Sequence, residues 1–248
     1  MHPLNQYFDM IYIINLDRRP DRWKSMTSRF QREGISLDGV TRIQAVDGSA
    51  QPYYSSWKSL TTKVFQGQHK LYTPGSYGYL LSMYRIFSHA LENDYSRILV
   101  CDDDLLFLKG WTGNSANYQN VLDQCDRYPW EICYFGYCHK GHRGSTPPTQ
   151  EVMSSHHFLQ RHGRGSINGS FFNGYTKSVY RPLMDMITRS RLPFDTGPLR
   201  QWYTSRGDKV ILVSGQIGVQ HLHDTDIQPS QSTRRLIEDW GWRMDDYH

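Results

Sequence analysis

Three consecutive aspartates, Asp102, Asp103 and Asp104, directly follow the apolar run 97–101 and are the residues best suited to chemistry. Side chains alternate along an extended chain, so Asp102 and Asp104 can face the same side. Neighbouring carboxylates repel each other unless a cation or a proton relieves the charge. Mg²⁺ and Mn²⁺ prefer oxygen ligands and commonly also hold substrate phosphates. The cluster therefore predicts a divalent-cation site with Asp102 and Asp104 as ligands.

Two other interpretations of the aspartates remain open. Asp is common in turns and at helix caps, so the three side chains could be solvated turn residues. A DxD pair also occurs in phosphatases of the haloacid-dehalogenase type, in which the first aspartate is the nucleophile. That type expects Thr or Val two residues after the second aspartate and usually carries the motif near the start of the chain. Here Leu106 follows and the motif is mid-chain, so the phosphatase interpretation is the weaker one.

A pair of histidines, His221 and His223, flanks Leu222 late in the chain. In an extended strand both imidazoles would face the same way. Imidazole binds Mn²⁺ as well as Zn²⁺, so either histidine is a candidate further metal ligand. A purely structural role for the pair is equally consistent with the pattern.

The elements that must position these residues alternate between strands and helices. Short apolar runs indicate strands at 11–14, 40–46, 97–101, 132–137, 171–175 and 209–213. Helical composition and end signals predict helices at 20–33, 74–91 and 178–188 and after residue 195. This alternation predicts one α/β domain over residues 1–248, with a mostly parallel sheet flanked by helices.

Two details of this scheme concern helix faces and loops. In the 74–91 helix, the residues Tyr77, Leu80, Leu81, Tyr84 and Phe87 fall on one face, which predicts that this face is buried. Segments 49–72 and 138–167 show no regular period and are expected to be loops.

Polar residues at the ends of the first two expected strands are candidates for ligand contacts. Asn15, Arg18 and Asp47 could reach a base, ribose or phosphate, because ligands bind at the carboxyl ends of strands in open α/β sheets. The alternatives are a surface ion pair between Asp17 and Arg18 and a plain turn at Asp47.

Composition excludes several classes of protein. The net charge is +4 and the basic residues are scattered, which argues against a nucleic-acid-binding surface. The four cysteines lack the spacing of a zinc knuckle and are expected to be reduced and structural. The sequence has neither a signal-peptide pattern nor an apolar stretch of membrane-spanning length. We expect a soluble, cytoplasmic protein.

Three separated blocks together resemble glycosyltransferase family 25, which includes bacterial lipopolysaccharide glycosyltransferases and collagen galactosyltransferases. The first block is Ile14–Arg22 with Met26, Phe30, Gly34 and 45–48; the second runs from Pro74-Gly75 through Gly78, Leu81-Ser82 and Ile86-Phe87 to 98–104; the third is 173–177, 193–195, Gln220 and 225–227. The chain departs from the family at Ser76, Tyr79, Met83 and Asp102, where the family usually has Glu, Cys, His and Glu. The departures at Ser76 and Met83 bear on donor or acceptor preference and on whether activity is retained.

The resemblance implies a GT-A fold, a UDP-sugar donor (galactose or glucose), Mn²⁺ or Mg²⁺, and inversion at the anomeric carbon. It places Asp195 as the base that deprotonates the acceptor hydroxyl, although Asp195 could equally cap the helix that follows it. Donor contacts are expected from the first half of the chain, about 1–110, and acceptor contacts from about 111–248. The expected donor contacts are Asn15, Leu16, Arg18, Asp47 and Asp103.

Three functions follow from these patterns. The first is a metal-dependent glycosyltransferase acting on a glycan or a hydroxylated protein. The second is a catalytically silent protein that binds nucleotide-sugar or glycan on the same fold, and the third is the aspartate-nucleophile phosphatase.

Overall fold

A seven-stranded mixed sheet forms the centre of the chain. The computed structural model describes residues 1–62, 71, 73–111, 114–139, 151–162, 165–222, 237, 240 and 242–248. The strand order is β2-β1-β3-β7-β5-β8-β6. The strands are β1 (Met10–Asn15), β2 (Val40–Gln44), β3 (Arg97–Asp102), β5 (Ile132–His139), β6 (Val152–Ser154), β7 (Ile167–Thr176) and β8 (Val210–Val213). A separate two-stranded sheet pairs β4 (Leu105–Phe107) with β9 (Gly218–Gln220).

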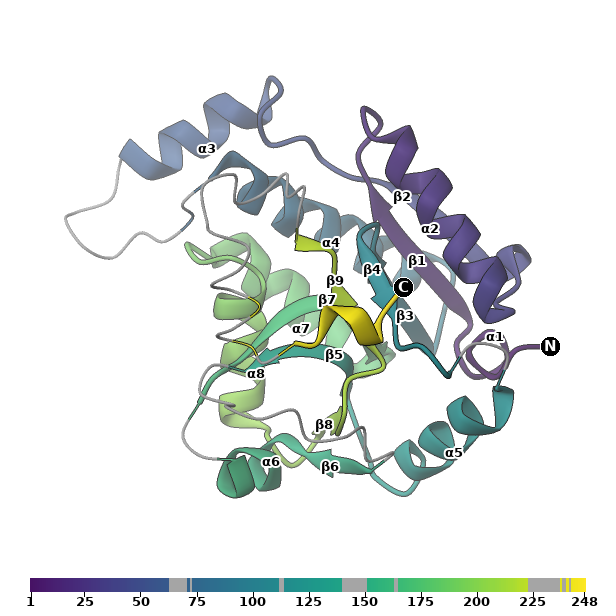
Figure 1. Ribbon diagram of the computed structural model, residues 1–248. Coiled ribbons are helices and arrows are strands. Elements are labelled where there is room, and N and C mark those ends of the chain that lie inside the picture. The colour runs from purple at the N-terminus through teal and green to yellow at the C-terminus, as the bar shows by residue number, and fades with distance from the viewer. Residues whose placement is uncertain are drawn as a thin grey trace.

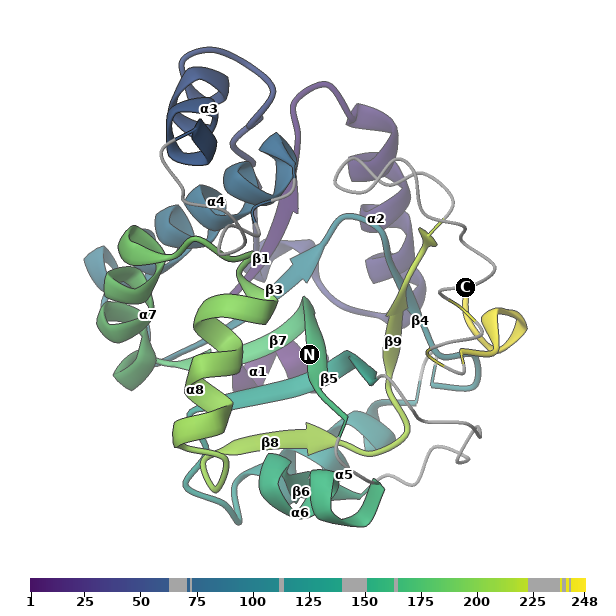
Figure 2. The same cartoon turned by 90° about the vertical axis from the view of Figure 1, so that its left-hand side faces the viewer.

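Helices cover both faces of the sheet, giving three layers (Figures 1 and 2). The first face carries α1 (Pro3–Tyr7), α2 (Pro20–Glu33) and α5 (Ser115–Cys125), and the opposite face carries α4 (Pro74–Glu92), α6 (Ser155–His162), α7 (Lys177–Arg189) and α8 (Arg200–Ser205). A further helix, α3 (Tyr53–Thr62), packs beside α4. The chain therefore has an α/β fold, as the sequence predicted.

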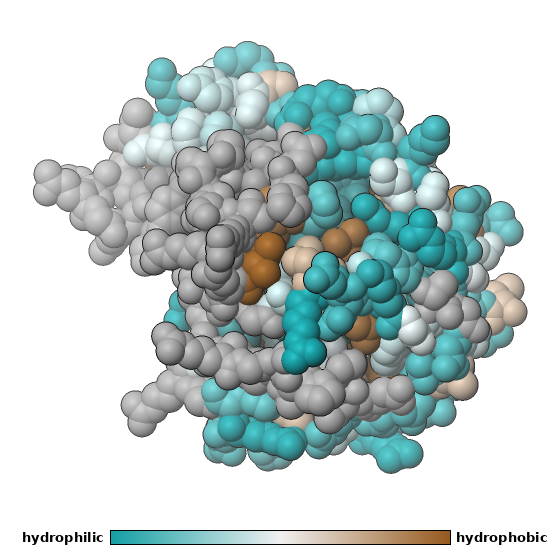
Figure 3. Space-filling view, viewed as in Figure 1, coloured by the Kyte–Doolittle hydropathy of each residue, from teal (hydrophilic) through white to brown (hydrophobic). Residues whose placement is uncertain are grey.

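Alternation along the strands explains why the sheet has two hydrophobic faces. In β1, Ile11 and Ile13 join the core on the α2 side, whereas Tyr12 and Ile14 join the core on the α4 side. A strand buried on both faces is apolar throughout, which is the pattern that made β1 and β3 recognisable in the sequence. The coloured part of the face shown in Figure 3 is mainly hydrophilic, with hydrophobic atoms visible near its centre.

The sheet is mixed, and its parallel part holds the strands that end near the aspartates. β1 pairs in parallel with both β2 and β3, and β5 pairs in parallel with β8. β7 lies antiparallel between β3 and β5, and β6 lies antiparallel to β8. The carboxyl ends of β1, β2 and β3 consequently meet at one edge of the sheet.

Several local expectations are confirmed. The predicted helix 20–33 is α2, and Gly34 ends it with a φ of 78°, a left-handed conformation that favours glycine. Thr73 caps α4, its side chain accepting a hydrogen bond from the amide of Ser76. Cys101, Cys125, Cys133 and Cys138 are buried free thiols. Among the described helices, none is both long and apolar enough to cross a membrane.

Other local expectations were wrong. Segment 49–72 contains α3, and segment 138–167 contains β6 and α6, so neither is simply a loop. The buried face of α4 is also rotated from the predicted one: Met83 and Ile86 are fully buried, whereas Tyr84 is 36% exposed. The helix turns small residues, Gly78 and Ser82, toward the loop that follows β2, and this close contact determines its orientation.

Candidate active site

An open cavity lies at the carboxyl ends of β1 and β3. Its walls come from β1, the loop after β2, the first turns of α4, the aspartate cluster and the end of β9. The lining residues are Ile14, Leu16, Arg18, Arg22, Ala45, Val46, Asp47, Gly48, Ser49, Gly75, Tyr79, Ser82, Asp102, Asp103, Asp104 and Gln220. Strand ends that converge on a cavity are the usual ligand site of an open α/β sheet.

The wall formed by residues 45–49 is held tightly against α4. A Cβ added at Gly48 would lie 1.8 Å from the carbonyl oxygen of Pro74, and one added at Gly78 would lie 2.2 Å from that of Val46. The Ser82 hydroxyl accepts a hydrogen bond of 2.8 Å from the amide of Val46. Because these contacts require glycine and a small polar residue, the wall has a defined position relative to α4.

Asp103 is fixed by two partners from the first half of the chain. Its Oδ2 accepts a 2.7 Å hydrogen bond from the side-chain amide of Asn15, and its Oδ1 lies 3.0 Å from the guanidinium of Arg22. Burial raises the pKa of Asp103, and the contacts with Asn15 and Arg22 oppose that rise. Asn15 is itself held by Arg42, whose Nε donates to its side-chain oxygen at 2.8 Å. Asp103 is therefore a structural anchor of the cluster.

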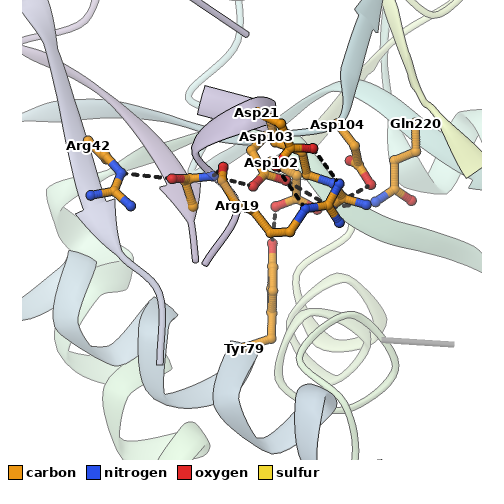
Figure 4. Close-up of polar contacts among 10 residues, drawn as sticks. Arg19, Asp21, Arg42, Tyr79, Asp102, Asp103, Asp104 and Gln220 are labelled. Atoms are coloured by element: carbon orange, nitrogen blue, oxygen red, sulfur yellow. Dashed lines mark hydrogen bonds and ion pairs between the residues drawn. The ribbon is translucent and has the colours of Figure 1, made fainter. Parts of the chain in front are cut away.

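Asp102 has a hydrogen-bond donor on each carboxylate oxygen. The Tyr79 hydroxyl donates to Oδ1 at 3.0 Å, and the Gln220 side-chain amide donates to Oδ2 at 3.2 Å. Figure 4 shows Tyr79 reaching from α4 to the cluster, with Gln220 approaching from β9. Burial, followed by repulsion from Asp104, raises the pKa of Asp102 well above its usual range, and the Tyr79 hydrogen bond opposes this.

Asp104 differs from the other two aspartates in the contacts of its carboxylate oxygens. Its Oδ1 is buried and has no hydrogen-bond partner among the described residues, while its Oδ2 lies 3.8 Å from Arg22. Burial raises the pKa of Asp104 to about 6, against the opposing effect of Arg22. A buried oxygen without a partner is costly and indicates a missing ligand such as an ion or water. An all-oxygen site of this kind fits Mg²⁺ or Mn²⁺.

The described residues do not complete a metal site by themselves. Among them, no group of three or more His, Cys, Asp or Glu side chains is arranged to hold a metal ion. The amide of His221 donates to the carbonyl oxygen of Asp104 at 2.8 Å, so β9 continues alongside the cluster. His223 lies outside the described residues. The predicted contribution of either imidazole to a metal site stays a prediction.

Arg18, Leu16 and Asp47 lie together on the cavity wall, as expected for residues at strand ends. Arg18 pairs with Asp47 at 3.0 Å, and this pair replaces the expected alternative of Arg18 with Asp17, because Asp17 instead pairs with Arg42 at 2.8 Å. Both members of the Arg18–Asp47 pair are partly exposed, so their ion pair adds little stability and leaves them accessible to a ligand. A second cavity shares Leu16, Arg18 and Asp47 with the first.

Asp195 does not line the cavity, but it is close to the residues that do. Its Oδ2 accepts from the amide of Gly169 at 3.2 Å and its Oδ1 from the amide of Thr196 at 2.8 Å. Asp195 begins the short π-helix 195–199, so the second bond resembles the helix cap that the sequence allowed as an alternative. Burial raises the pKa of this carboxyl group, and the backbone hydrogen bonds oppose the rise.

The sequence did not assign roles to Arg22, Tyr79 and Gln220, which contact the aspartates. Arg22 carried a signal: a cation in the first turn of a helix opposes the helix dipole and therefore suggests a partner elsewhere. Gln220 carried another, as a polar residue directly after the short apolar stretch 217–219. Tyr79 carried none. Of the four family departures, Tyr79 and Asp102 line the cavity, whereas Ser76 and Met83 do not; Met83 is fully buried in the core.

Together, the fold and the cavity define an α/β protein with an acidic, arginine-flanked ligand site at its strand ends. The sequence matches the family described as glycosyltransferase family 25 (LPS biosynthesis protein) over residues 8–174. That match covers more than half of the chain and includes β1, β2, β3 and the aspartates, but not β9. The chain belongs to glycosyltransferase family 25.

Individual members of the family share less than a third of their residues with this chain over the matched region. Procollagen galactosyltransferase 2 of Homo sapiens is 29% identical over 140 residues, which is 54% of this chain and 22% of that protein. Inactive glycosyltransferase 25 family member 3 of Homo sapiens is 28% identical over 134 residues, which is 52% of this chain and 22% of that protein. The chain thus matches about a fifth of the length of these relatives.

Among solved structures, the chain has a weak similarity to a glycosyltransferase involved in the glycosylation of the major capsid of PBCV-1. It has a TM-score of 0.45 and 10% sequence identity, and the match covers 87% of this chain and 94% of that chain.

Proposed function

We propose that this chain transfers a hexose, galactose or glucose, from a UDP-sugar to a hydroxyl group of a glycan or protein, with inversion at the anomeric carbon. Family membership supports the transfer of a sugar, and a relative named as a galactosyltransferase supports the choice of hexose. The observation that carries the proposal is the buried Oδ1 of Asp104, which has no hydrogen-bond partner among the described residues, in a cavity that also presents Arg18 and Arg22. Carboxylate and cation together suit a metal-bound diphosphate.

The donor side of the site would use residues from the first half of the chain. Asp104 would hold a divalent cation, with Asp102 behind it and His221 or His223 as a further ligand. When bound, the cation would neutralise charge on the departing diphosphate. Arg18 and Arg22 lie where they can pair with phosphate oxygens.

Nucleoside contacts would come from the wall of the cavity. Leu16 offers an apolar surface, and Asp47 a carboxylate that can accept hydrogen bonds from ribose hydroxyls. Asp103 is part of the cavity lining, and Asn15 would support it from behind, since the two buried side chains are hydrogen-bonded to each other.

The acceptor side would depend on Asp195 as general base. Its carboxylate takes the proton of the acceptor hydroxyl, whose oxygen forms the new bond to the anomeric carbon as the bond to the diphosphate oxygen breaks. Attack from the face opposite the leaving group gives inversion. The raised pKa of this carboxyl group makes it a stronger base than an ordinary aspartate.

A second candidate is a catalytically silent protein that binds nucleotide-sugar. Two observations favour it: both oxygens of Asp102 already have donors, and one relative is named as inactive. The occupied state of Asp102 also weakens the phosphatase alternative, in which this residue must attack phosphorus as a nucleophile. Membership of family 25 favours a transferase over a phosphatase.

A nucleotide screen tests the donor site. Thermal unfolding would be followed with UDP, GDP or CMP, each with and without Mn²⁺, because a ligand of the folded state raises Tm by mass action. We expect UDP to stabilise the chain only with Mn²⁺, and Asp104→Asn to abolish the effect. Arg161→Met, which alters an exposed ion pair with Glu151, serves as the control and should retain it. Absence of a shift with every nucleotide contradicts the proposal. Binding without any turnover of UDP-galactose or UDP-glucose supports the silent alternative.

A further inference from the structure

Tyr79 connects the donor-side aspartates to Asp195. Its hydroxyl lies 3.0 Å from Asp102 Oδ1, 3.1 Å from the carbonyl oxygen of Ser170 and 3.0 Å from the Ser170 hydroxyl. The residue before Ser170 is Gly169, whose amide donates to Asp195. A continuous series of polar contacts thus runs from Asp102 through Tyr79 and the start of β7 to Asp195.

The ring of Tyr79 makes a second connection to the same place. It packs against Phe194, the neighbour of Asp195, with ring centroids 6.3 Å apart. Phe194 is buried and also packs against Phe87 of α4 at 6.2 Å, so the backbone that carries Asp195 is anchored to α4. Tyr79 therefore contacts both parts of the site: its hydroxyl contacts Asp102 on the donor side, and its ring packs against Phe194, next to Asp195.

We propose that Tyr79 is a positioning residue that fixes Asp195 relative to the donor site, a role that rests on the proposed function. A hydroxyl has one proton, so Tyr79 donates to Asp102 or to the Ser170 carbonyl while accepting from the Ser170 hydroxyl. The bond to an ionised carboxylate is the stronger of the two. This arrangement ties the start of β7 to Asp102, and the Gly169 amide then holds Asp195.

Asp102 keeps one hydrogen bond when the Tyr79 hydroxyl is removed, because the Gln220 side-chain amide still donates to its other carboxylate oxygen. Asp195 loses more, because the hydroxyl links Ser170, next to the Gly169 amide that holds Asp195, to the Asp102 side chain, in addition to the backbone pairing of β3 with β7. The Tyr79→Phe substitution should therefore affect the chemical step more than donor binding. Misplacement of a reacting group by about 1 Å can cost on the order of 100-fold in rate.

The test is a double-mutant cycle on donor hydrolysis, with UDP-galactose and UDP-glucose as substrates, Mn²⁺ present and water as acceptor. We would measure kcat for the wild type, Tyr79→Phe, Asp195→Asn and the double variant. The Kd for UDP in the presence of Mn²⁺ would be measured by calorimetry. We expect Tyr79→Phe to lower kcat by roughly 10- to 100-fold while UDP affinity stays within about threefold. The double variant should be no slower than Asp195→Asn alone, since Tyr79 acts through Asp195.

The control is Tyr84→Phe on the same helix, which removes an exposed hydroxyl and should change neither quantity. If Tyr79→Phe lowers Tm enough to prevent assay, Ser170→Ala removes a partner of the same hydroxyl and takes its place. Additive losses in the double variant, an unchanged kcat, an ineffective Asp195→Asn, or a large loss of UDP affinity in Tyr79→Phe each overturn the positioning role. Absence of hydrolysis in the wild type instead contradicts the proposed function itself.

Discussion

The strongest prediction for stability concerns Arg22, because its guanidinium lies between Asp103 and Asp104. The side chains of Arg22 and Asp103 are only 13% and 9% exposed, and their charged atoms are 3.0 Å apart. Removing one member of a pair this well buried leaves an uncompensated charge, at a cost of about 3–5 kcal/mol. Arg22→Met should therefore lower the free energy of unfolding by this amount, equivalent to a fall in Tm of roughly 6–20 °C.

Urea unfolding at neutral pH without divalent cations measures the effect, with Arg161→Met as matched control. The Arg161–Glu151 pair has a similar separation of 3.1 Å, but its side chains are 60% and 50% exposed. Its loss should cost about 0–1 kcal/mol. Adding Asp103→Asn to Arg22→Met should recover part of the loss, because the buried charge is then gone. Equal effects of the two arginine substitutions would refute the view that the cluster depends on this ion pair.

Three further predictions concern the cavity wall and the charge of the cluster. Gly48→Ala should reduce folded yield sharply in an expression and melting comparison, since the new Cβ would lie 1.8 Å from the Pro74 carbonyl oxygen. Ser82→Ala should cost about 1–3 kcal/mol in urea unfolding, because the buried amide of Val46 loses its acceptor. The pKa of Asp104 is raised to about 6, so the folded state binds protons more tightly than the unfolded state, and stability without divalent cations should fall as pH rises from about 4 to 6. Asp104→Asn should flatten this part of the pH profile, and an unchanged profile would contradict the assignment.

Local signals in the sequence were enough to predict most of the elements. The helix 20–33 was predicted with the ends that the structure has, because Pro20 and Gly34 mark them and the residues between have helical composition. The apolar strands were equally clear, since β1 and β3 are buried on both faces. α3 and α6 were missed because aromatic and polar residues dominate them without a regular apolar period.

The arrangement of the strands was harder to predict than their existence. β7 reads as a strand in the sequence, but nothing in its residues says that it enters antiparallel between β3 and β5. That choice depends on tertiary packing, and it brings Ser170 to Tyr79. The mixture of parallel and antiparallel pairs in the sheet therefore could not be predicted from local sequence patterns.

The candidate site divides in the same way. The position and spacing of the three aspartates were enough to predict them as candidate site residues. Their different surroundings, in contrast, depend on partners far away in the chain. Arg22 lies 81 residues from Asp103, and Gln220 lies 118 residues from Asp102. Within the part of the chain that the structure describes, these contacts leave Asp104 as the one of the three with a buried oxygen that has no hydrogen-bond partner, a difference that no local pattern encodes.

The most direct test of the proposed transferase is the release of UDP from UDP-galactose and UDP-glucose, followed by chromatography with and without Mn²⁺. Wild-type protein should release UDP only with the cation, and Asp104→Asn should lose the release while remaining folded. Tyr84→Phe should release UDP at the wild-type rate. Release that is independent of Mn²⁺, or that persists in Asp104→Asn, would contradict the metal-dependent donor site proposed here.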